Sequence, residues 1–304
     1  TASIGLMAVF LVDFVDMIFI AMLGKAELAA AVGYAATILF FTTSFGIGMA
    51  IAGARPIAEI QFEGFAYPAF DQIASHLGRI RFRSRGNASL PMVLRMPNGA
   101  GIGAHEHHCD SPEAFFAHVP GVTVVVPSSP SDAKGLLAAA IRSPDPVIFL
   151  EPKVLYRAGR EEVPDDAYEL PIGRARIRRA GTTLTVVTYG GMVPVSLRAA
   201  EAVADDGIDV EVIDLRTIKP WDVETVTASV VRTGRLLVVQ EPQRTGGIAA
   251  EVVAEVAERC GYDLVAPPRR LTATDAPWPQ FAIEKHALLT DAMVASEIRE
   301  LARS

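Results

Sequence analysis

The sequence predicts an α/β protein with two doubly wound parallel-sheet units, preceded by an apolar helical hairpin. Short apolar runs rich in β-branched residues recur between Ile57 and Glu241, and helix-like stretches separate them. Alternation of this kind is typical of parallel sheets with helices on both faces. The hairpin is predicted by a third observation, because charged residues are almost absent before Arg55.

The individual elements follow from these runs. Strands are expected over 57–62, 91–96, 122–127, 146–151, 183–190, 209–215 and 235–241. Helices are expected over 66–80, 131–142, 192–206, 222–232 and 248–260. The stretch from 157 to 173 is charged, contains proline and lacks periodicity, as linkers do. The expected organisation is a hairpin over 1–53, a first domain over 54–156, a linker over 157–179 and a second domain over 180–304.

The apolar N-terminal part contains two segments, 4–23 and 28–53, each long enough to cross a membrane, which takes about 20 apolar residues. Membrane contact through residues 1–53 is therefore one expectation, and a pair of buried helices in a soluble protein is the alternative. A cleaved signal peptide is not expected, because no basic region precedes the apolar run and the run is too long.

Composition limits the classes of partner. The chain of 304 residues has a net charge of −7, and this acidity argues against a nucleic-acid partner. Its two cysteines, Cys109 and Cys260, lie far apart without the spacing of metal ligands. Two free thiols in a reducing compartment are therefore expected, which favours a cytoplasmic α/β module.

Candidate site residues follow three of the predicted strands, because ligands of parallel sheets bind at the carboxyl ends of strands. Gln61, Phe65 and Tyr67 lie at the end of the first strand. A glycine-rich loop after the second strand leads into "HEHHCDSPEAFFAH", and "PQRTGG" follows the last strand. The "RTGG" segment suits either an anion site at a helix N-terminus or a tight turn.

The glycine-rich region carries four histidines: His105, His107, His108 and His118. Proton exchange with a substrate is the favoured interpretation, since a glycine-rich loop lets an imidazole approach a ligand closely. A metal site is disfavoured because no paired carboxylates lie nearby, and structural histidines remain an alternative. "GAGIG" is a weak phosphate-binding signal, because it lacks the lysine of a P-loop.

Five segments, taken together in their order along the chain, indicate a protein family. They are "GARPIAEIQFEGFAYPAFDQI", "RMPNGAGIGAHEHHCDSPEAFFAHVPGVTVVVPSSPSDAKGLLAAAIRSPDPVIFLEPKVLYR", "VVTYGGMV", "VIDLRTIKPWD" and "EPQRTGGIAAEV". Over about residues 48–304 they resemble the β subunit of the thiamine-diphosphate-dependent 2-oxoacid dehydrogenases. The form "HEHHCDSPEA" is closer to the branched-chain 2-oxoacid type than to the pyruvate type. The resemblance implies an N-terminally truncated transketolase-like pyrimidine-binding domain and a transketolase C-terminal-like domain.

The resemblance also implies a function. Such a subunit would form an α2β2 heterotetramer with an α subunit, decarboxylate a 2-oxoacid oxidatively, transfer the acyl group to lipoamide and dock on a lipoyl acyltransferase core. Thiamine diphosphate would lie between the subunits, with magnesium held mainly by the α subunit. Gln61 and Phe65 match the residues that line its aminopyrimidine ring. His108 matches a histidine that assists proton transfer during acyl transfer, and His118 matches one with an ordering role.

The chain departs from the family in its N-terminal part. "FVDMIFIAMLGKAELAAAVGYAATILFFTTSFGIGMAIA" resembles the first two helices of the multidrug and toxic-compound extrusion transporters, a resemblance that covers residues 1–52, and Asp16 lies at their cation-coupling position. The family glutamate that activates the cofactor falls on Leu39, and no acidic residue stands between Glu27 and Glu59. Loss of such a group typically costs ~10²- to 10⁴-fold in rate, so impaired activity is expected. A membrane-tethered or non-catalytic assembly module, or a pyruvate dehydrogenase β subunit, is the alternative function.

Overall fold

The computed structural model describes residues 46–280 and 282–304. The chain divides into two compact units, Thr1–Ala54 and Arg55–Ser304. In the first unit, residues 46–51 are helical, and residues 1–45 of the predicted hairpin lie outside the described residues. Among the residues that the structure describes, no helix is long and apolar enough to cross a membrane.

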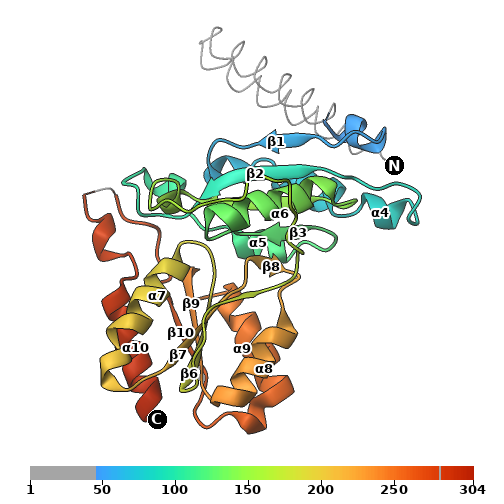
Figure 1. Ribbon diagram of the computed structural model, residues 1–304. Coiled ribbons are helices and arrows are strands. Elements are labelled where there is room, and N and C mark those ends of the chain that lie inside the picture. The colour runs from blue at the N-terminus through green and yellow to red at the C-terminus, as the bar shows by residue number, and fades with distance from the viewer. Residues whose placement is uncertain (1–45, 281) are drawn as a thin grey trace. The chain divides into compact units, whose positions relative to one another are not determined.

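The second unit contains two five-stranded sheets, and the first of them carries the candidate site (Figure 1). Its strands, in spatial order, are β1 (Ile57–Glu59), β2 (Val93–Asn98), β4 (Val147–Pro152), β3 (Thr123–Val125) and β8 (Thr217–Lys219). The first four are parallel, and β8 pairs antiparallel with β3. Strand β8 comes from the C-terminal half of the sequence, so it ties the two halves of this unit together.

One helix, α6 (Pro130–Arg142), packs on this sheet. It begins where the Ser129 side chain accepts a hydrogen bond from the N–H of Asp132, with Pro130 in the first turn. Leu136 and Ala140 on its inner face share a core cluster with apolar residues of β2, β3 and β4. Strand β4 is a nearly continuous apolar run and is almost entirely buried, as is typical of a strand inside a parallel sheet.

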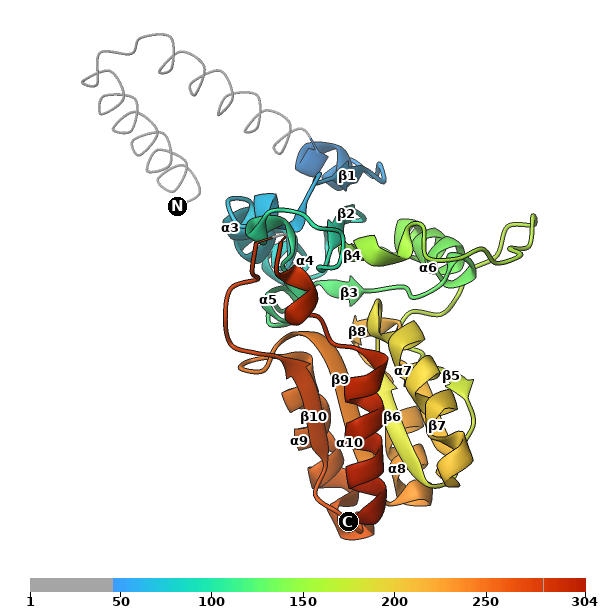
Figure 2. The ribbon, with the colours of Figure 1, turned by 90° about the vertical axis from the view of Figure 1, so that its left-hand side faces the viewer.

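The second sheet is more fully covered. Its strands, in spatial order, are β10 (Arg269–Ala273), β9 (Leu236–Gln243), β6 (Leu184–Thr188), β7 (Val210–Asp214) and β5 (Arg176–Arg179). Its helices are α7 (Met192–Ala202), α8 (Val223–Thr233), α9 (Ile248–Cys260) and α10 (Asp291–Arg303). Helices α7 and α10 lie on one face, and α8 and α9 lie on the other (Figures 1 and 2).

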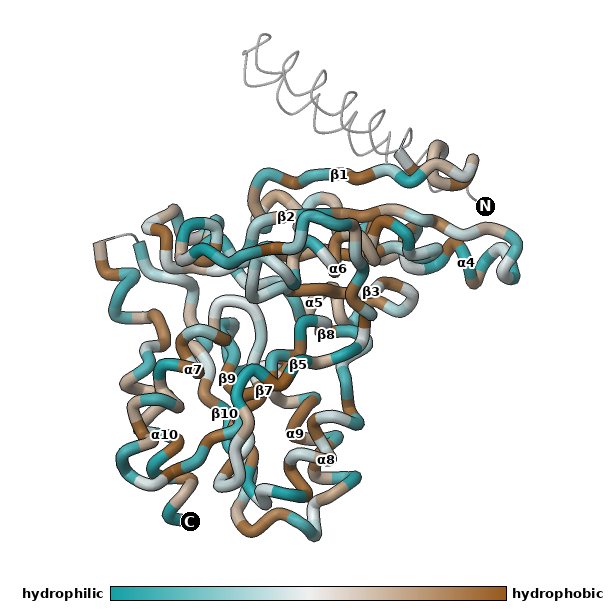
Figure 3. The backbone as a smooth tube through the Cα atoms, viewed as in Figure 1, coloured by the Kyte–Doolittle hydropathy of each residue, from teal (hydrophilic) through white to brown (hydrophobic). Residues whose placement is uncertain are grey.

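Burial follows the amphipathic pattern of these helices. Hydrophobic and hydrophilic residues alternate along α10 (Figure 3), and its buried residues Val294, Ile298 and Leu301 are spaced by four and three positions. They join apolar residues of α7, β6, β7 and β9 in one core cluster. This packing fixes the C-terminal sheet beneath the loops described below.

The structure confirms the α/β class and corrects three details of the prediction. The sheets are mixed, not purely parallel, because β5 and β8 run antiparallel at their edges. Strand β5 ("RIRR") lies in the segment expected to be a linker and is charged and partly exposed, so it lacks the apolar signature of a central strand. The helix expected over 66–80 is divided into short turns that end near Gly78, where a Cβ atom would lie 2.4 Å from the Pro120 carbonyl oxygen.

Candidate functional site

Three loops meet at the carboxyl ends of β1, β2 and β4. The short helix η1 (Glu63–Ala66) follows β1, the loop 99–109 with its helix η3 (Glu106–His108) follows β2, and η4 (Lys153–Leu155) follows β4. Gly64 allows the first two to approach, because a Cβ atom there would lie 2.2 Å from the carbonyl oxygen of His107. Any larger residue would separate the two loops.

The side chain of His108 lies within a group of rings from these loops. The Phe62 ring stacks on it with centroids 4.2 Å apart and an interplanar angle of 9°. The Phe65 ring meets it edge-on at 5.3 Å, and the His107 ring lies at 4.0 Å. Phe65 is half exposed, while the buried Nδ1 atom of His108 has no hydrogen-bond partner in the structure. A half-exposed aromatic ring thus lies beside a buried imidazole nitrogen that has no hydrogen-bond partner in the structure.

Two of the three predicted site residues, Phe65 and His108, are therefore in contact. The third, Gln61, is exposed and directly precedes Phe62. His118 lies apart in sequence, exposed at the end of α5 (Glu113–Ala117), where its N–H donates to the Ala114 carbonyl.

A buried ion pair lies beneath the rings. The Lys153 ammonium donates to both carboxylate oxygens of Glu63, at 2.6 and 2.7 Å, and both side chains are almost fully buried. Burial raises the pKa of Glu63 to about 7, against the opposing effect of Lys153. The same ammonium lies 5.5 Å from the centre of the Phe62 ring. This pair was not predicted from the sequence: Lys153 directly follows β4, and Glu63 lies four residues after the end of β1.

Two further carboxylates bind the glycine-rich loop. Glu241, in β9, accepts hydrogen bonds from the N–H of Ala100 at 2.7 Å and from the hydroxyl of Ser111 at 3.1 Å. Glu284 begins the short helix η7 (Glu284–His286) and accepts from the N–H groups of Gly101 and Gly103, both at 2.8 Å. The backbone donors of this loop thus bind carboxylates of the same chain, which agrees with the weak phosphate-loop signal of "GAGIG".

Next to Glu241 lies a small buried group of polar side chains. Asn98 donates to the Glu113 carboxyl group at 3.3 Å, while the second oxygen of Glu113, the Asn98 oxygen and the Tyr189 hydroxyl have no partner in the structure. Burial raises the pKa of Glu113 to about 8, and Glu241 adds to this effect. This raised pKa favours the protonated form of Glu113 in the folded protein.

Glu113 should make stability fall as pH rises. Its folded-state pKa lies above the unfolded value, so its contribution is complete below about pH 4.5 and is lost as pH rises toward about 8. Urea midpoints measured between pH 4.5 and 8.5 should decline, and Glu113→Gln should flatten this decline. Glu258→Gln on the exposed face of α9 is the matched control. An unchanged slope in Glu113→Gln would show that the carboxyl is ionised in the fold.

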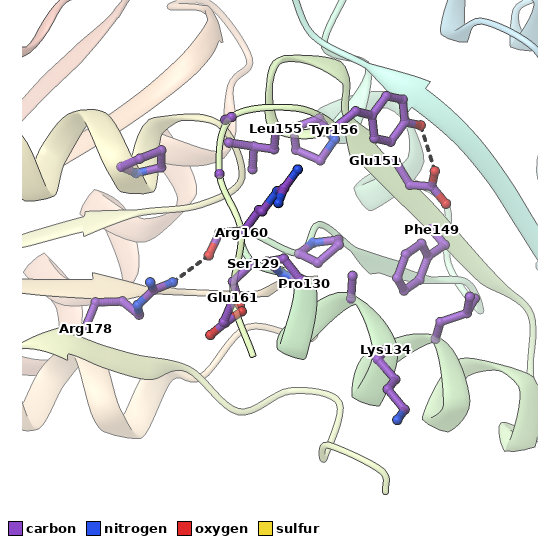
Figure 4. Close-up of a pocket in the computed structure, with 18 of the residues that line it drawn as sticks. Ser129, Pro130, Lys134, Phe149, Glu151, Leu155, Tyr156, Arg160, Glu161 and Arg178 are labelled. Atoms are coloured by element: carbon purple, nitrogen blue, oxygen red, sulfur yellow. Dashed lines mark hydrogen bonds between the residues drawn. The ribbon is translucent and has the colours of Figure 1, made fainter. Parts of the chain in front are cut away.

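Figure 4 shows a separate cleft of about 690 Å³ between the start of α6 and the segment 155–161. Its polar groups are largely bonded within the chain: Tyr156 donates to Glu151 at 2.7 Å, and Arg178 donates to Ser128 at 3.0 Å. None of the three predicted site residues lines it. The ring group around His108 is therefore the better candidate site.

The two cysteines and the possible metal ligands of the described residues complete the survey of reactive side chains. Cys109 and Cys260 are free and buried, and burial raises the pKa of the Cys109 thiol to about 12. Within the described ranges 46–280 and 282–304, no three histidine, cysteine or acidic side chains are grouped to hold a metal ion.

Comparison with known proteins identifies the family. The model of the transketolase pyrimidine binding domain matches residues 41–159, and that of the transketolase C-terminal domain matches residues 173–294. The pyruvate dehydrogenase E1 component subunit beta of Acholeplasma laidlawii is 48% identical over 258 residues, which cover 85% of this chain and 79% of that protein. This chain belongs to the β-subunit family of the thiamine-diphosphate-dependent 2-oxoacid dehydrogenases.

Other comparisons agree with this family. The corresponding subunit of Staphylococcus epidermidis is 49% identical to this β subunit over 233 residues, or 77% of this chain and 72% of that protein. A solved structure described as a split gene transketolase, inactive beta4 tetramer, matches with a TM-score of 0.69 and 22% identity, over 86% of this chain and 80% of that one. This last likeness concerns the fold.

The ring group of this β subunit fits one side of a flat heteroaromatic cofactor. The half-exposed Phe65 ring offers a surface for contact with a ring, and the unpartnered Nδ1 of His108 offers a hydrogen-bonding atom next to it. Asp16, Leu39 and the part of the transporter-like segment before residue 46 lie outside the described residues.

Proposed function

We propose that this β subunit supplies the aminopyrimidine side of a thiamine diphosphate site through Gln61 and Phe65, with His108 beside them as the catalytic residue. The observation that carries the proposal is the unpartnered His108 Nδ1, held between the Phe62 and Phe65 rings. Phe65 would contact the pyrimidine ring, and the exposed Gln61 amide would hydrogen-bond its edge. When bound, the cofactor supplies the electron sink for decarboxylation.

His108 would move a proton during acyl transfer to lipoamide. An imidazole is suited to this role because it gains and loses a proton near neutral pH. Its ring plane is fixed by the stack with Phe62, so the free nitrogen has a defined direction. His107, at 4.0 Å, would contribute to the polarity around it.

A subunit that supplies only the aminopyrimidine side of the cofactor site requires a partner for the other side. An α subunit would hold the diphosphate and its magnesium and complete an α2β2 heterotetramer, which would dock on a lipoyl acyltransferase core in the cytoplasm. Support comes from the sequence resemblance and from the similar proteins named above, which are β subunits.

The proposed substrate is a branched-chain 2-oxoacid. The form of the segment "HEHHCDSPEA" supports it. Pyruvate is the second candidate, because the similar proteins named above are pyruvate dehydrogenase subunits. The activity of the chain is proposed to be impaired, since Leu39 stands at the position of the activating glutamate.

Co-expression with a cognate α subunit tests these points. A stable heterotetramer should elute as one species, and it should release CO₂ from 3-methyl-2-oxobutanoate faster than from pyruvate. The rates should lie ~10²- to 10⁴-fold below those of the same assembly made with an unaltered family β subunit. Failure to bind the α subunit would refute the assembly. Ordinary rates would refute the impairment, and a preference for pyruvate would select the second substrate.

A further inference from the structure

The chain between β10 and α10 leaves the C-terminal sheet and reaches the loops at the end of the first sheet (Figure 2). We call this segment, residues 274–290, the C-terminal strap; all of it except residue 281 is described. It contains Trp278, which is buried, and the short helix η7. The strap therefore belongs in sequence to the C-terminal domain but lies against the loop that carries His108.

Apolar packing holds the strap on the loop 99–109. Trp278 shares a buried cluster with Ala100 and Cys109, and Leu288 packs against the same cluster. A Cβ atom on Gly101 would lie 4.0 Å from a methyl carbon of Leu288, so the loop backbone itself is in contact with the strap.

Glu284 adds a directed interaction to this packing. Each of its carboxylate oxygens accepts a hydrogen bond of 2.8 Å from a different loop amide, those of Gly101 and Gly103. Both glycines have positive φ angles, +92° and +69°, and their N–H groups, two residues apart, bind the same carboxylate. Only 6% of Glu284 is exposed, so little water competes for these bonds.

The Cys109 thiol extends the interaction to the far end of the loop. Its Sγ atom lies 3.6 Å from the same Glu284 oxygen that Gly101 binds. Cys109 directly follows His108, so one carboxylate restrains the loop on both sides of the histidine. Glu284 contacts Gly101, Gly103 and Cys109, and its link to the His108 ring therefore runs through the backbone of the loop and the Cys109 thiol.

We propose that Glu284 is a positioning residue, which orients His108 by binding the amides of Gly101 and Gly103 and thereby links the C-terminal domain to acyl transfer. The proposal rests on the proposed role of His108. A misplacement of about 1 Å costs a reaction on the order of 10²-fold, which sets the scale of the effect. It should act on acyl transfer and leave decarboxylation nearly unchanged.

The test compares Glu284→Gln, Glu284→Ala and the control Lys285→Gln, each assembled with the α subunit. Glu284→Gln keeps the volume of the side chain but places an NH₂ group against one of the two amide donors. Lys285 is the exposed neighbour in the same short helix. Thermal melts of all three establish that the variants are folded.

Two measurements are made on each assembly. Hydrogen exchange of the loop amides, including Gly101 and Gly103, should accelerate at least tenfold in both Glu284 variants and stay unchanged in Lys285→Gln. The ratio of lipoyl-domain acylation to decarboxylation should fall about 10- to 100-fold in the Glu284 variants. Unchanged loop exchange would overturn the proposal, and so would an equal fall of both rates.

The failure of the proposed function gives a different pattern. If the wild-type assembly neither decarboxylates a 2-oxoacid nor acylates a lipoyl domain, the role of His108 is refuted and with it the link to acyl transfer. The exchange data still decide whether Glu284 holds the loop, because they require no turnover.

Discussion

Replacement of His108 with Asn should lower acyl transfer to a lipoyl domain by ~10²- to 10⁴-fold, the range for removal of a positioned proton-transfer group. Decarboxylation followed with an artificial electron acceptor should change much less, because it precedes that proton transfer. The measured quantity is the ratio of the two rates on one preparation.

His118→Asn is the control for this experiment, because His118 is exposed at the end of α5 and lies outside the ring group described above. It should leave the ratio at the wild-type value. If His108→Asn also leaves the ratio unchanged, His108 orders the loop without moving a proton. A stack with Phe62 that serves only for packing would give that outcome.

Buried strands could be predicted from the sequence more accurately than short strands at the edge of a sheet. The strand β4 is almost entirely buried, and its run of apolar residues was recognised within one residue of its observed bounds. Strand β8 has three residues and pairs at the edge of the first sheet. Its neighbours in the sequence, β7 and β9, belong to the second sheet. A short edge strand of this kind carries little periodicity, so its place is decided by tertiary contacts.

The site residues that the sequence predicts differ in their place along the chain from those that only the structure reveals. Phe65 and His108 belong to loops directly after strands, where functional side chains of parallel sheets are expected. Glu241 and Glu284 reach the histidine loop from 141 and 183 positions away along the chain. A carboxylate that binds a distant backbone amide leaves no local pattern, so only the folded structure reveals it.

Replacement of Lys153 with Met should destabilise the subunit by about 3–5 kcal/mol, the range for breaking a buried ion pair. The change keeps the length of the aliphatic side chain but leaves the Glu63 carboxylate buried without its cation. Removal of Lys153 also removes the charge that opposes burial, so the pKa of Glu63 should rise above about 7. Urea unfolding of the heterotetramer and of the isolated subunit measures the loss.

The loss should depend on pH with a definite sign. A buried carboxyl group with a raised folded-state pKa costs no stability at a pH where it is protonated in both the folded and the unfolded state. At higher pH the unfolded state ionises first, and the free energy of unfolding falls. Lys153→Met should therefore be least destabilised near pH 4.5 and most destabilised above pH 8. The double variant Glu63→Met/Lys153→Met removes both charges, so it should recover most of the stability and lose this pH dependence, because an apolar pair of similar size replaces a buried ion pair at little cost. If the double variant is as unstable as Lys153→Met, packing beneath Phe62 accounts for the loss and the ion pair does not.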